Sequence, residues 1–265
     1  MIRIAYYQVD AFTARTFGGN PAGVCVLERA LAGETCQRIA AENNLAETAF
    51  LKRQEDNSYH LRWFTPLMEV HLCGHATLAS ALVLFSELGY AGNQIRFQTR
   101  SGILSATRKG EIIELDFPSR PPAPCPAPEL LGRALGRPPQ EVLKSRDFMA
   151  VYDCQEEVAA LAPRMDLLAQ LDCLGVIVTA RGEDADFVSR FFAPRAGVPE
   201  DPVTGSAHST LIPFWAERLG KKELLARQIS KRGGELYCRQ MGERVGIGGR
   251  AVIYSRGELE IPTDL

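Results

Sequence analysis

The chain has 265 residues, of which 46% are hydrophobic and 23% charged, and its formal net charge is −2. This is the composition of a globular protein with one large domain or two smaller ones. Acidic and basic residues are mixed along the chain, and no apolar run approaches the ~18 residues of a membrane helix. The first residues also lack the apolar core of a signal peptide. We therefore expect a soluble, cytoplasmic protein that binds neither nucleic acid nor membrane.

Seven cysteines are dispersed along the chain without a CxxC pair. An odd, scattered set in a chain of this length is typical of reduced thiols that fill the core. We expect neither a disulfide framework nor a structural zinc site.

The first half of the chain alternates strand-like and helix-like segments. Strands are predicted at residues 2–9, 24–27, from about 47 to 51, at 59–64, and near 94–99, 102–108 and 111–117. Helices are predicted at 33–43 and from Gly74 to a stop at Gly89. A loop rich in Gly, Pro and Asn lies between the first two strands.

The segment 118–128 contains six prolines in eleven residues. Proline lacks the N–H of a helix or central strand, so this segment is predicted to be an extended connector between two halves. The second half is predicted to repeat the pattern. Its strands lie near 147–153, 175–179, 187–192, 226–231, 234–240, 243–248 and 251–256, with helices around 156–170 and 206–219.

Two pairs of short motifs indicate an internal duplication. The segment 62–66 (RWFTP) resembles 190–194 (RFFAP), and 73–76 (CGHA) resembles 204–207 (TGSA). Chance similarity of two strand–loop–helix units is the alternative. Two related halves would bring the helix starts at Gly74 and Gly205 face to face across a cleft, where ligands usually bind. The free N–H groups of a first helical turn attract anions, and glycine permits close approach of a ligand.

Glu47 lies among small and apolar residues in the segment 44–50 (NLAETAF). A carboxylate in such a setting is a candidate general base or acid. The alternative is an exposed glutamate at a strand edge.

His75 follows Gly74 at a predicted helix start, where the helix dipole favours the neutral imidazole. It is a candidate to hydrogen-bond a substrate anion. His71 lies four residues earlier, but Gly74 interrupts the helix that a metal-binding HxxxH pair requires, so we expect no metal site.

Asp201, Thr204 and Ser206 lie at the start of the second such helix. Their plain structural interpretation is a turn and helix N-caps. A serine hydrolase is disfavoured because Ser206 lacks the GxSxG context. Cys73 is a candidate thiolate at the first helix start, although its counterpart in the repeat is Thr204.

Six motifs together resemble the PhzF-like family of isomerases of phenazine biosynthesis. They are 10–13 (DAFT), 19–24 (GNPAGV), 44–50 (NLAETAF), 62–66 (RWFTP), 73–77 (CGHAT) and 201–208 (DPVTGSAH). The resemblance implies an α/β, diaminopimelate-epimerase-like fold of two similar halves. Each half wraps a mostly antiparallel sheet around a central helix, with the active site between them. The halves would be residues 1–117, completed by a strand at about 257–265, and residues 129–256, with 118–128 as the linker. The resemblance also implies a homodimer.

The reaction implied by the resemblance is a proton shift without a cofactor. In the family's best-understood case a dihydro-hydroxyanthranilate is isomerised on the way to phenazines. Carried over, Glu47 is the acid/base, with His75 and Asp201 as further catalytic residues. The implied substrate is a small carboxylated molecule, anthranilate-like in the family's best-understood case. The residues implied to bind it are Asn20, Cys73, Gly74, Thr204, Gly205 and Ser206.

Two alternatives remain open at this point. The chain is a small-molecule-binding protein of the same fold that has lost turnover, or it is a racemase or epimerase that depends on Cys73. Related epimerases use one cysteine from each half, and Thr204 stands where the second would be.

Overall fold

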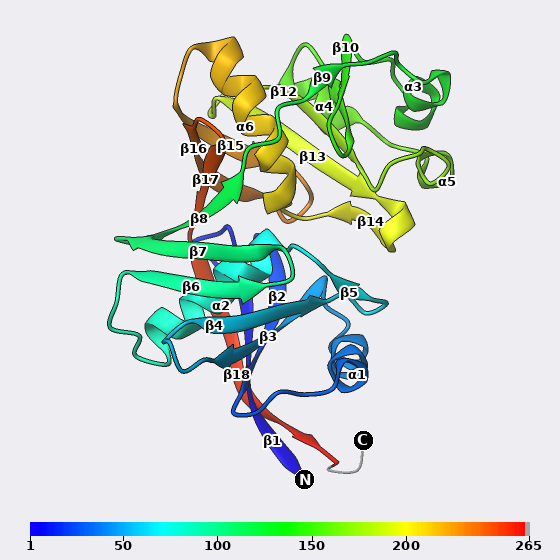
Figure 1. Ribbon diagram of the computed structural model, residues 1–265. Helices are drawn as coiled ribbons and strands as arrows, with labels where there is room; N and C mark the ends of the chain where they lie inside the picture. Colours follow the sequence, from blue (N-terminus) through cyan, green and yellow to red (C-terminus); the bar gives the residue numbers. More distant parts are fainter. Residues whose placement is uncertain (263–265) are drawn as a thin grey trace. The chain divides into compact units, whose positions relative to one another are not determined.

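The computed structural model describes residues 1–262, and they divide into two compact units. Unit 1 comprises Met1–Asp116 together with the returning segment from Gly248, and unit 2 comprises Phe117–Ile247. Each unit is a sheet with a long helix packed against it (Figure 1). Among the described residues, no helix is long and apolar enough to span a membrane.

Unit 1 contains most of the elements predicted for the first half. Its strands are β1 (Ile2–Ala11), β2 (Asn20–Leu27), β3 (Glu47–Arg53), β4 (Tyr59–Phe64), β5 (Glu69–Val70), β6 (Gln94–Thr99), β7 (Gly102–Lys109), β8 (Ile112–Pro118) and β18 (Ala251–Ile261). Its helices are α1 (Gly33–Asn43) and α2 (Gly74–Ser86). Strand β2 begins four residues earlier than predicted, at Asn20, inside the Gly/Pro/Asn segment.

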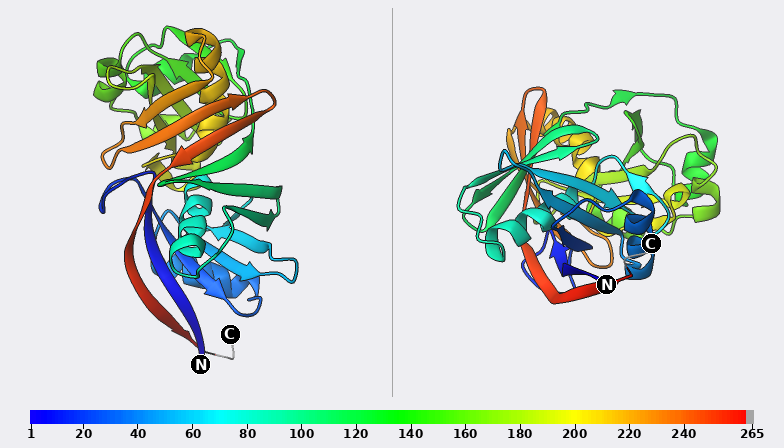
Figure 2. Two further views of the ribbon diagram at one scale, coloured as in Figure 1. Left: turned by 90° about the vertical axis from the view of Figure 1, so that its left-hand side faces the viewer. Right: turned by 60° about the horizontal axis from the view of Figure 1, so that its bottom comes forward.

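Strand β18 completes unit 1. It pairs antiparallel with β1 from Ala251, opposite Ala11, to Ile261, opposite Ile2. Figure 2 shows these two long strands side by side. The sequence predicted completion only from about residue 257, with 251–256 assigned to the second half; the pairing starts earlier because β1 extends to Ala11. Residues 263–265 of the predicted strand lie outside the described part of the chain.

Helix α2 is the central helix of unit 1. Nearly every residue from Gly74 to Phe85 is buried, and the helix packs against β1, β2, β3, β7 and β18. A helix that is apolar on all sides is stable only when it is enclosed. The sheet follows it round in the order β18–β1–β2–β3–β4–β6–β7–β8, in which only β2–β3 and β4–β6 are parallel.

Unit 2 repeats this pairing. Its strands are β9 (Ala123–Pro124), β10 (Glu141–Lys144), β11 (Phe148–Val151), β12 (Val176–Arg181), β13 (Phe187–Ala193), β14 (Val198–Asp201), β15 (Glu223–Gln228), β16 (Gly234–Met241) and β17 (Arg244–Gly249, its last residues in unit 1). Its helices are α3 (Glu129–Leu135), α4 (Gln155–Ala160), α5 (Met165–Leu168) and α6 (Gly205–Leu219), with a 3₁₀ turn at Pro194–Ala196. The helical pieces predicted around 156–170 are the two short helices α4 and α5, whereas α3, β9, β10 and β14 were not predicted.

The strand pairings confirm the duplication and the predicted fold class. In unit 1, β2 runs parallel to β3, β3 antiparallel to β4, and β4 parallel to β6. In unit 2, β11 runs parallel to β12, β12 antiparallel to β13, and β13 parallel to β15. The short strands β5 and β14 lie antiparallel on β4 and β13 in turn. Two sheets with the same mixed order arise most simply from one repeated sequence pattern.

The proline-rich segment lies within unit 2, whereas the sequence predicted a separate linker at 118–128. Pro213 inside α6 has no N–H for the carbonyl of Ser209, four residues earlier. The N–H of Arg120 donates to that carbonyl instead, at 2.8 Å. Ala123 and Pro124 then pair with β10. Pro213 therefore leaves the carbonyl of Ser209 free to accept the bond from Arg120, and this bond holds the proline-rich segment 118–128 against α6.

Gly249 lies where the chain returns to unit 1, against Phe12 and Leu78. A Cβ at Gly249 would lie 2.4 Å from the ring of Phe12 and 3.2 Å from Leu78. We expect Gly249→Ala to lower the free energy of unfolding by about 1–3 kcal/mol, because both neighbours are fully buried. Gly257→Ala in the following strand, β18, is the matched control, since its Cβ meets nothing within 4 Å. Urea unfolding of both variants makes the comparison; equal stabilities would contradict it.

Candidate functional site

Glu47 stands at the start of β3 because α1 ends immediately before it. Asn44 takes the left-handed conformation (φ 49°) that closes the helix, and its N–H bonds to Ala40. Because β2 and β3 are parallel, both strands begin at the same sheet edge, with Ala22 opposite Glu47. The beginning of β2 brings Asn20 to that edge.

His75, in the first turn of α2, meets both of these side chains. His75 Nε2 lies 3.0 Å from Glu47 Oε2, and Asn20 Nδ2 lies 3.1 Å from His75 Nδ1. Cys73 Sγ lies 3.6 Å from the same Nδ1. The sequence predicted Glu47, His75, Cys73 and Asn20 as site residues, and the structure brings these four side chains into one group, called here the Glu47 cluster.

The Glu47 cluster is buried except for Glu47 itself, which is partly exposed. Asn20, Cys73 and His75 are all buried, whereas the side chain of Glu47 keeps 17% of its exposure. Glu47 is therefore the member of the cluster that a ligand in solvent can reach. Asn20 is fully buried on His75, which makes it a partner of the histidine.

The charge state of His75 differs from the sequence prediction. Burial opposes protonation, but the hydrogen bond with Cys73 and the carboxylate of Glu47 outweigh it and hold the pKa of His75 well above its usual value. The helix start was expected to favour the neutral imidazole. The prediction was wrong because the opposite charge 3.0 Å away comes from β3, a contact that the local sequence does not reveal.

The thiol of Cys73 is suppressed by its surroundings. Burial, and next the carboxylate of Glu47, raise its pKa to about 11. Cys73 thus holds its proton at neutral pH, and a thiol is a weak nucleophile and metal ligand compared with a thiolate.

We expect Cys73 to resist alkylation by iodoacetamide at neutral pH. Cys125 and Cys154 are partly exposed, and we expect each to react at least ~10-fold faster than Cys73. Peptide mass spectrometry of the native protein at a series of times measures the individual rates. Modification of Cys73 as fast as Cys125 would contradict this burial and protonation state.

The Glu47 cluster is also a set of potential metal ligands. One donor atom from each of Glu47, Cys73 and His75 lies within 4.8 Å of the others. In the described structure the two ring nitrogens of His75 face Asn20 and Glu47, and a metal would have to displace one of these contacts and deprotonate the thiol. The donor set therefore fits proton exchange better than it fits a resident metal.

In unit 2 the predicted residues form a second group at the start of α6. Thr204 donates from its hydroxyl to Asp201 Oδ2 at 2.6 Å. Gln228, at the end of β15, accepts from the N–H of Thr204 at 2.8 Å and donates to the carbonyl of Asp201 at 2.7 Å. The sequence analysis missed Gln228, and its place in a strand without a motif carried no signal for it. Ser206 and Gly205 occupy the first turn of α6.

The plain N-cap interpretation of Thr204 does not describe the start of α6. Thr204 occupies the N-cap position of α6, but its hydroxyl donates to Asp201 and does not bond the first turn of the helix. The first-turn N–H groups of α6 are therefore not satisfied by the N-cap side chain, which suits a helix start that receives an anionic group.

The duplication is chemically asymmetric. The pairing of Thr48 with Phe64 corresponds to that of Val176 with Phe192, so the counterpart of Glu47 is Gly175. A Cβ at Gly175 would lie 2.3 Å from the ring of Phe191, which leaves no room for a carboxylate. Unit 1 alone can supply an acid/base group at this position of the repeat.

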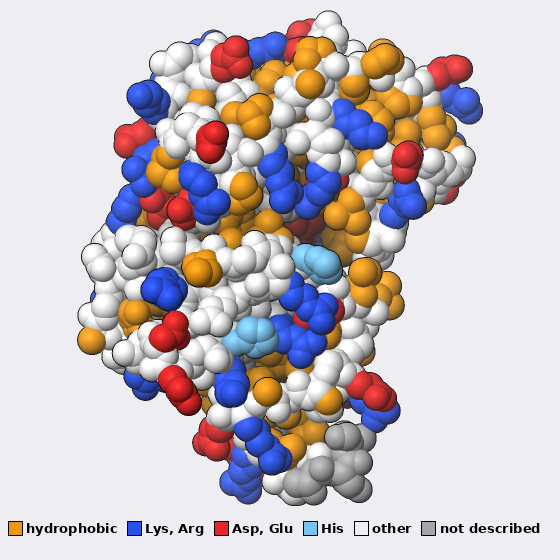
Figure 3. Space-filling view, viewed as in Figure 1, with side chains coloured by type: hydrophobic (Ala, Val, Ile, Leu, Met, Phe, Trp, Pro, Cys, Tyr) orange, Lys and Arg blue, Asp and Glu red, His pale blue; other side chains and the backbone are white. Residues whose placement is uncertain are grey.

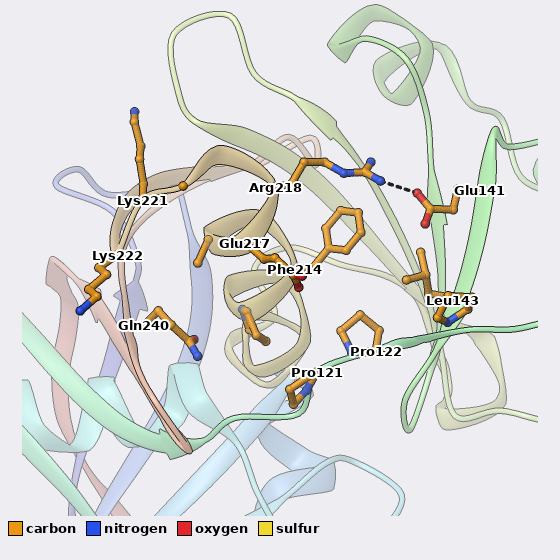
Figure 4. A pocket seen from close by; sticks show the side chains of 14 residues that line it. Pro121, Pro122, Glu141, Leu143, Phe214, Glu217, Arg218, Lys221, Lys222 and Gln240 are labelled. Carbon is orange, nitrogen blue, oxygen red and sulfur yellow. Dashed lines mark hydrogen bonds and ion pairs between the residues drawn. The ribbon is translucent and has the colours of Figure 1, made fainter.

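An open cavity lies elsewhere in unit 2. It has a volume of about 830 Å³, and Figure 4 shows Phe214 and Arg218 of α6 facing it, with Arg218 bonded to Glu141. None of the predicted site residues lines it. Its charged groups are mixed, as they are over the face drawn in Figure 3, where Lys and Arg alternate with Asp and Glu.

Comparison with known proteins agrees with the geometry. A family model described as "Phenazine biosynthesis-like protein" matches residues 9–257. An uncharacterized isomerase of Pseudomonas aeruginosa is 52% identical over 260 residues, which cover 98% of this chain and 100% of the relative. A PhzF-family crystal structure from Enterococcus faecalis has a TM-score of 0.95 at 46% identity, covering 98% of this chain and 100% of that one.

A more distant structure extends the likeness of fold. A hydroxyproline epimerase from Agrobacterium vitis, solved with bound trans-4-hydroxy-L-proline, has a TM-score of 0.66 at 11% identity, and the match covers 97% of this chain and 92% of the epimerase. At this identity the likeness concerns the fold alone.

Proposed function

Because the chain belongs to the phenazine biosynthesis-like protein family, and three bacterial relatives about half identical to it are named isomerases, we propose that it is a proton-shifting isomerase with Glu47 as its acid/base. The observation that carries the proposal is the pair formed by Glu47 and the buried His75, 3.0 Å apart. This pair is present in one half of a duplicated fold whose other half has Gly175 at the corresponding position.

The proposed reaction has two steps. The carboxylate of Glu47 takes a proton from a substrate carbon: the C–H bond breaks, an O–H bond forms on Glu47, and the electron pair moves into the conjugated system of the substrate. Glu47 then returns the proton to a different carbon, and the double bond moves. The reaction has no net oxidation or reduction, so the proposal includes no redox cofactor.

The surroundings of Glu47 suit both steps. His75 binds one carboxylate oxygen and fixes the side chain, which is still 17% exposed. In this proposal the N–H groups at the start of α2 bind a carboxylate of the substrate, since a helix N-terminus favours an anion. We propose a small, carboxylated, conjugated substrate, cyclic and anthranilate-like in the leading case.

Cys73-dependent racemisation is less well supported. That mechanism needs a thiolate to remove the proton and a second base on the opposite side of the carbon. Burial and Glu47 keep Cys73 protonated, with its pKa at about 11, and the counterpart in unit 2 is Thr204.

A two-stage experiment tests the proposal. Thermal-shift screening of small conjugated carboxylates selects ligands, because a ligand of the native state raises the melting temperature. Each ligand is then incubated with the protein in D₂O with a chelator present, and proton NMR follows its carbon-bound hydrogens. We expect loss of one carbon-bound proton signal and appearance of an isomer. A ligand that binds tightly without exchange or isomerisation would favour the binding protein that has lost turnover.

A further inference from the structure

Asn20 has a contact that its family motif does not explain. It is fully buried at the start of β2, and its side-chain amide lies 3.1 Å from Nδ1 of His75, the ring nitrogen on the far side from Glu47. The two ring nitrogens of His75 therefore have different partners: a carboxylate at Nε2 and an amide at Nδ1.

An amide is suited to a nitrogen that gains and loses a proton. Its C=O accepts and its NH₂ donates, and a half-turn exchanges the two groups with little change in shape. Nδ1 of an imidazolium is a donor and needs an acceptor, whereas Nδ1 of the Nε2–H imidazole is an acceptor and needs a donor. A carboxylate at the same place could only accept, so it would pair with the imidazolium alone. An apolar side chain would pair with neither state.

Both protonation states of His75 are accessible as the pH changes. While Glu47 is a carboxylate, its charge stabilises the imidazolium, whereas burial of the ring favours the neutral imidazole. Above the pKa of His75 the proton on Nδ1 passes to solvent, and the proton transfers at Glu47 do not require it. The other group acting on the ring, the Cys73 sulfur at 3.6 Å from Nδ1, is a weak hydrogen-bond partner.

We propose that Asn20 is a positioning residue that serves His75 in both protonation states, its amide accepting from Nδ1–H when the ring is cationic and donating to Nδ1 when the ring is neutral. In this role Asn20 keeps the ring aimed at Glu47 throughout the reaction. The inference deepens the proposed function and rests on it for its place in turnover. The ring contact itself is independent of any substrate.

Two nearly isosteric variants test the proposal in opposite directions. Asn20→Asp supplies only acceptors and a negative charge, so we expect the pKa of His75 to rise by about 1 to 3 pH units. Asn20→Leu removes the partner of Nδ1 in both states, and because a hydrogen bond to the charged ring is stronger than one to the neutral ring, we expect the pKa of His75 to fall. NMR titration of the histidine ring signals measures both. A residue that only fills space would move the pKa in the same direction in both variants, or not at all, and either result would overturn the proposal.

The control is Asn43→Asp. Asn43 lies in the same unit and donates to the hydroxyl of Thr48 at 3.2 Å. Its replacement by Asp adds the same negative charge without a contact to the ring of His75. We expect it to move the pKa of His75 by less than Asn20→Asp does. A shift as large as that of Asn20→Asp would show that the effect is long-range, and would overturn the contact role.

The wild-type protein gives a test that does not require a buried variant to fold. We expect a nitrogen–nitrogen coupling across the hydrogen bond from Asn20 Nδ2–H to His75 Nδ1 above the pKa of His75, and its loss below. A coupling that persists unchanged through the titration, or that is absent at both ends, would overturn the amide exchange. Because no turnover is measured, this experiment can fail while isomerase activity stands, and the reverse.

Discussion

Glu47→Gln is expected to abolish isomerisation while the protein stays folded and still binds its ligand. Glutamine keeps the shape of the side chain but cannot take a proton from carbon, and general acid–base catalysis by one positioned group contributes about 10²–10⁴-fold to a rate. We expect kcat to fall by at least ~10²-fold, with KM changed much less.

The control for this variant is Glu55→Gln. Glu55 is exposed in the loop after β3, outside the Glu47 cluster, so its neutralisation should leave kcat unchanged. Thermal unfolding of both variants separates a loss of chemistry from a loss of fold. Full activity in Glu47→Gln with an unchanged melting temperature would contradict the assignment of Glu47 as the acid/base.

Arg190→Met is expected to cause the largest loss of stability among the charged residues discussed. Arg190 binds both oxygens of Glu200, at 2.7 and 3.1 Å, and donates to the carbonyls of Val158 and Leu161. Its side chain is only 12% exposed. Removing it leaves a partly buried carboxylate and backbone carbonyls without their donor. Breaking such a pair costs about 3–5 kcal/mol.

The repeat supplies the matched variant, Arg62→Met. Arg62 binds both oxygens of Glu69, at 2.8 and 2.9 Å, and lies over Phe64 as Arg190 lies over Phe192, each at 4.9 Å from the ring centre. Glu69 also has Arg100 at 2.8 Å, so its charge keeps a partner. We therefore expect a smaller loss than for Arg190→Met, by about 1 kcal/mol or more.

Chemical denaturation of the two variants measures both losses. The double variant Arg190→Met/Glu200→Leu should recover part of the loss of Arg190→Met, because it removes the unpaired charge. Equal losses for Arg62→Met and Arg190→Met would show that the carbonyl bonds and the second arginine contribute little.

The duplication could be predicted from the sequence because short motifs keep their order in both halves. From the sequence, Arg62 and Arg190 could be recognised only as identical residues at corresponding positions of the repeat. Their shared function, binding a glutamate on the next short strand, depends on β5 and β14. Strands of two and four residues carry too little periodicity to be predicted, and β14 was missed for this reason.

The proline-rich segment shows a second limit. Six prolines correctly excluded a helix or a central strand there, but they do not exclude packing. The bond from Arg120 to Ser209 depends on Pro213, a residue more than ninety positions away in the sequence. Such a bond between two irregular features has no local signature.

The residues of the Glu47 cluster could be predicted from the sequence, but the contacts between them could not. Glu47, Cys73, His75 and Asn20 come from three motifs, and the sequence placed each in a motif without showing which would touch. The parallel pairing of β2 with β3 brings Asn20 and Glu47 to one sheet edge, and the packing of α2 on these strands adds Cys73 and His75. The charge of His75 follows from its contact with Glu47, so a prediction from the helix start alone had the wrong sign.

The central claim is that Glu47 moves a proton between carbons of a bound substrate. Its most direct measurement is solvent-deuterium incorporation into the substrate and product by the wild-type protein, Glu47→Gln and Glu55→Gln, followed by NMR in D₂O. The account predicts deuterium at one defined carbon with the wild-type protein and with Glu55→Gln, and none with Glu47→Gln. Incorporation at the wild-type rate by Glu47→Gln would contradict it.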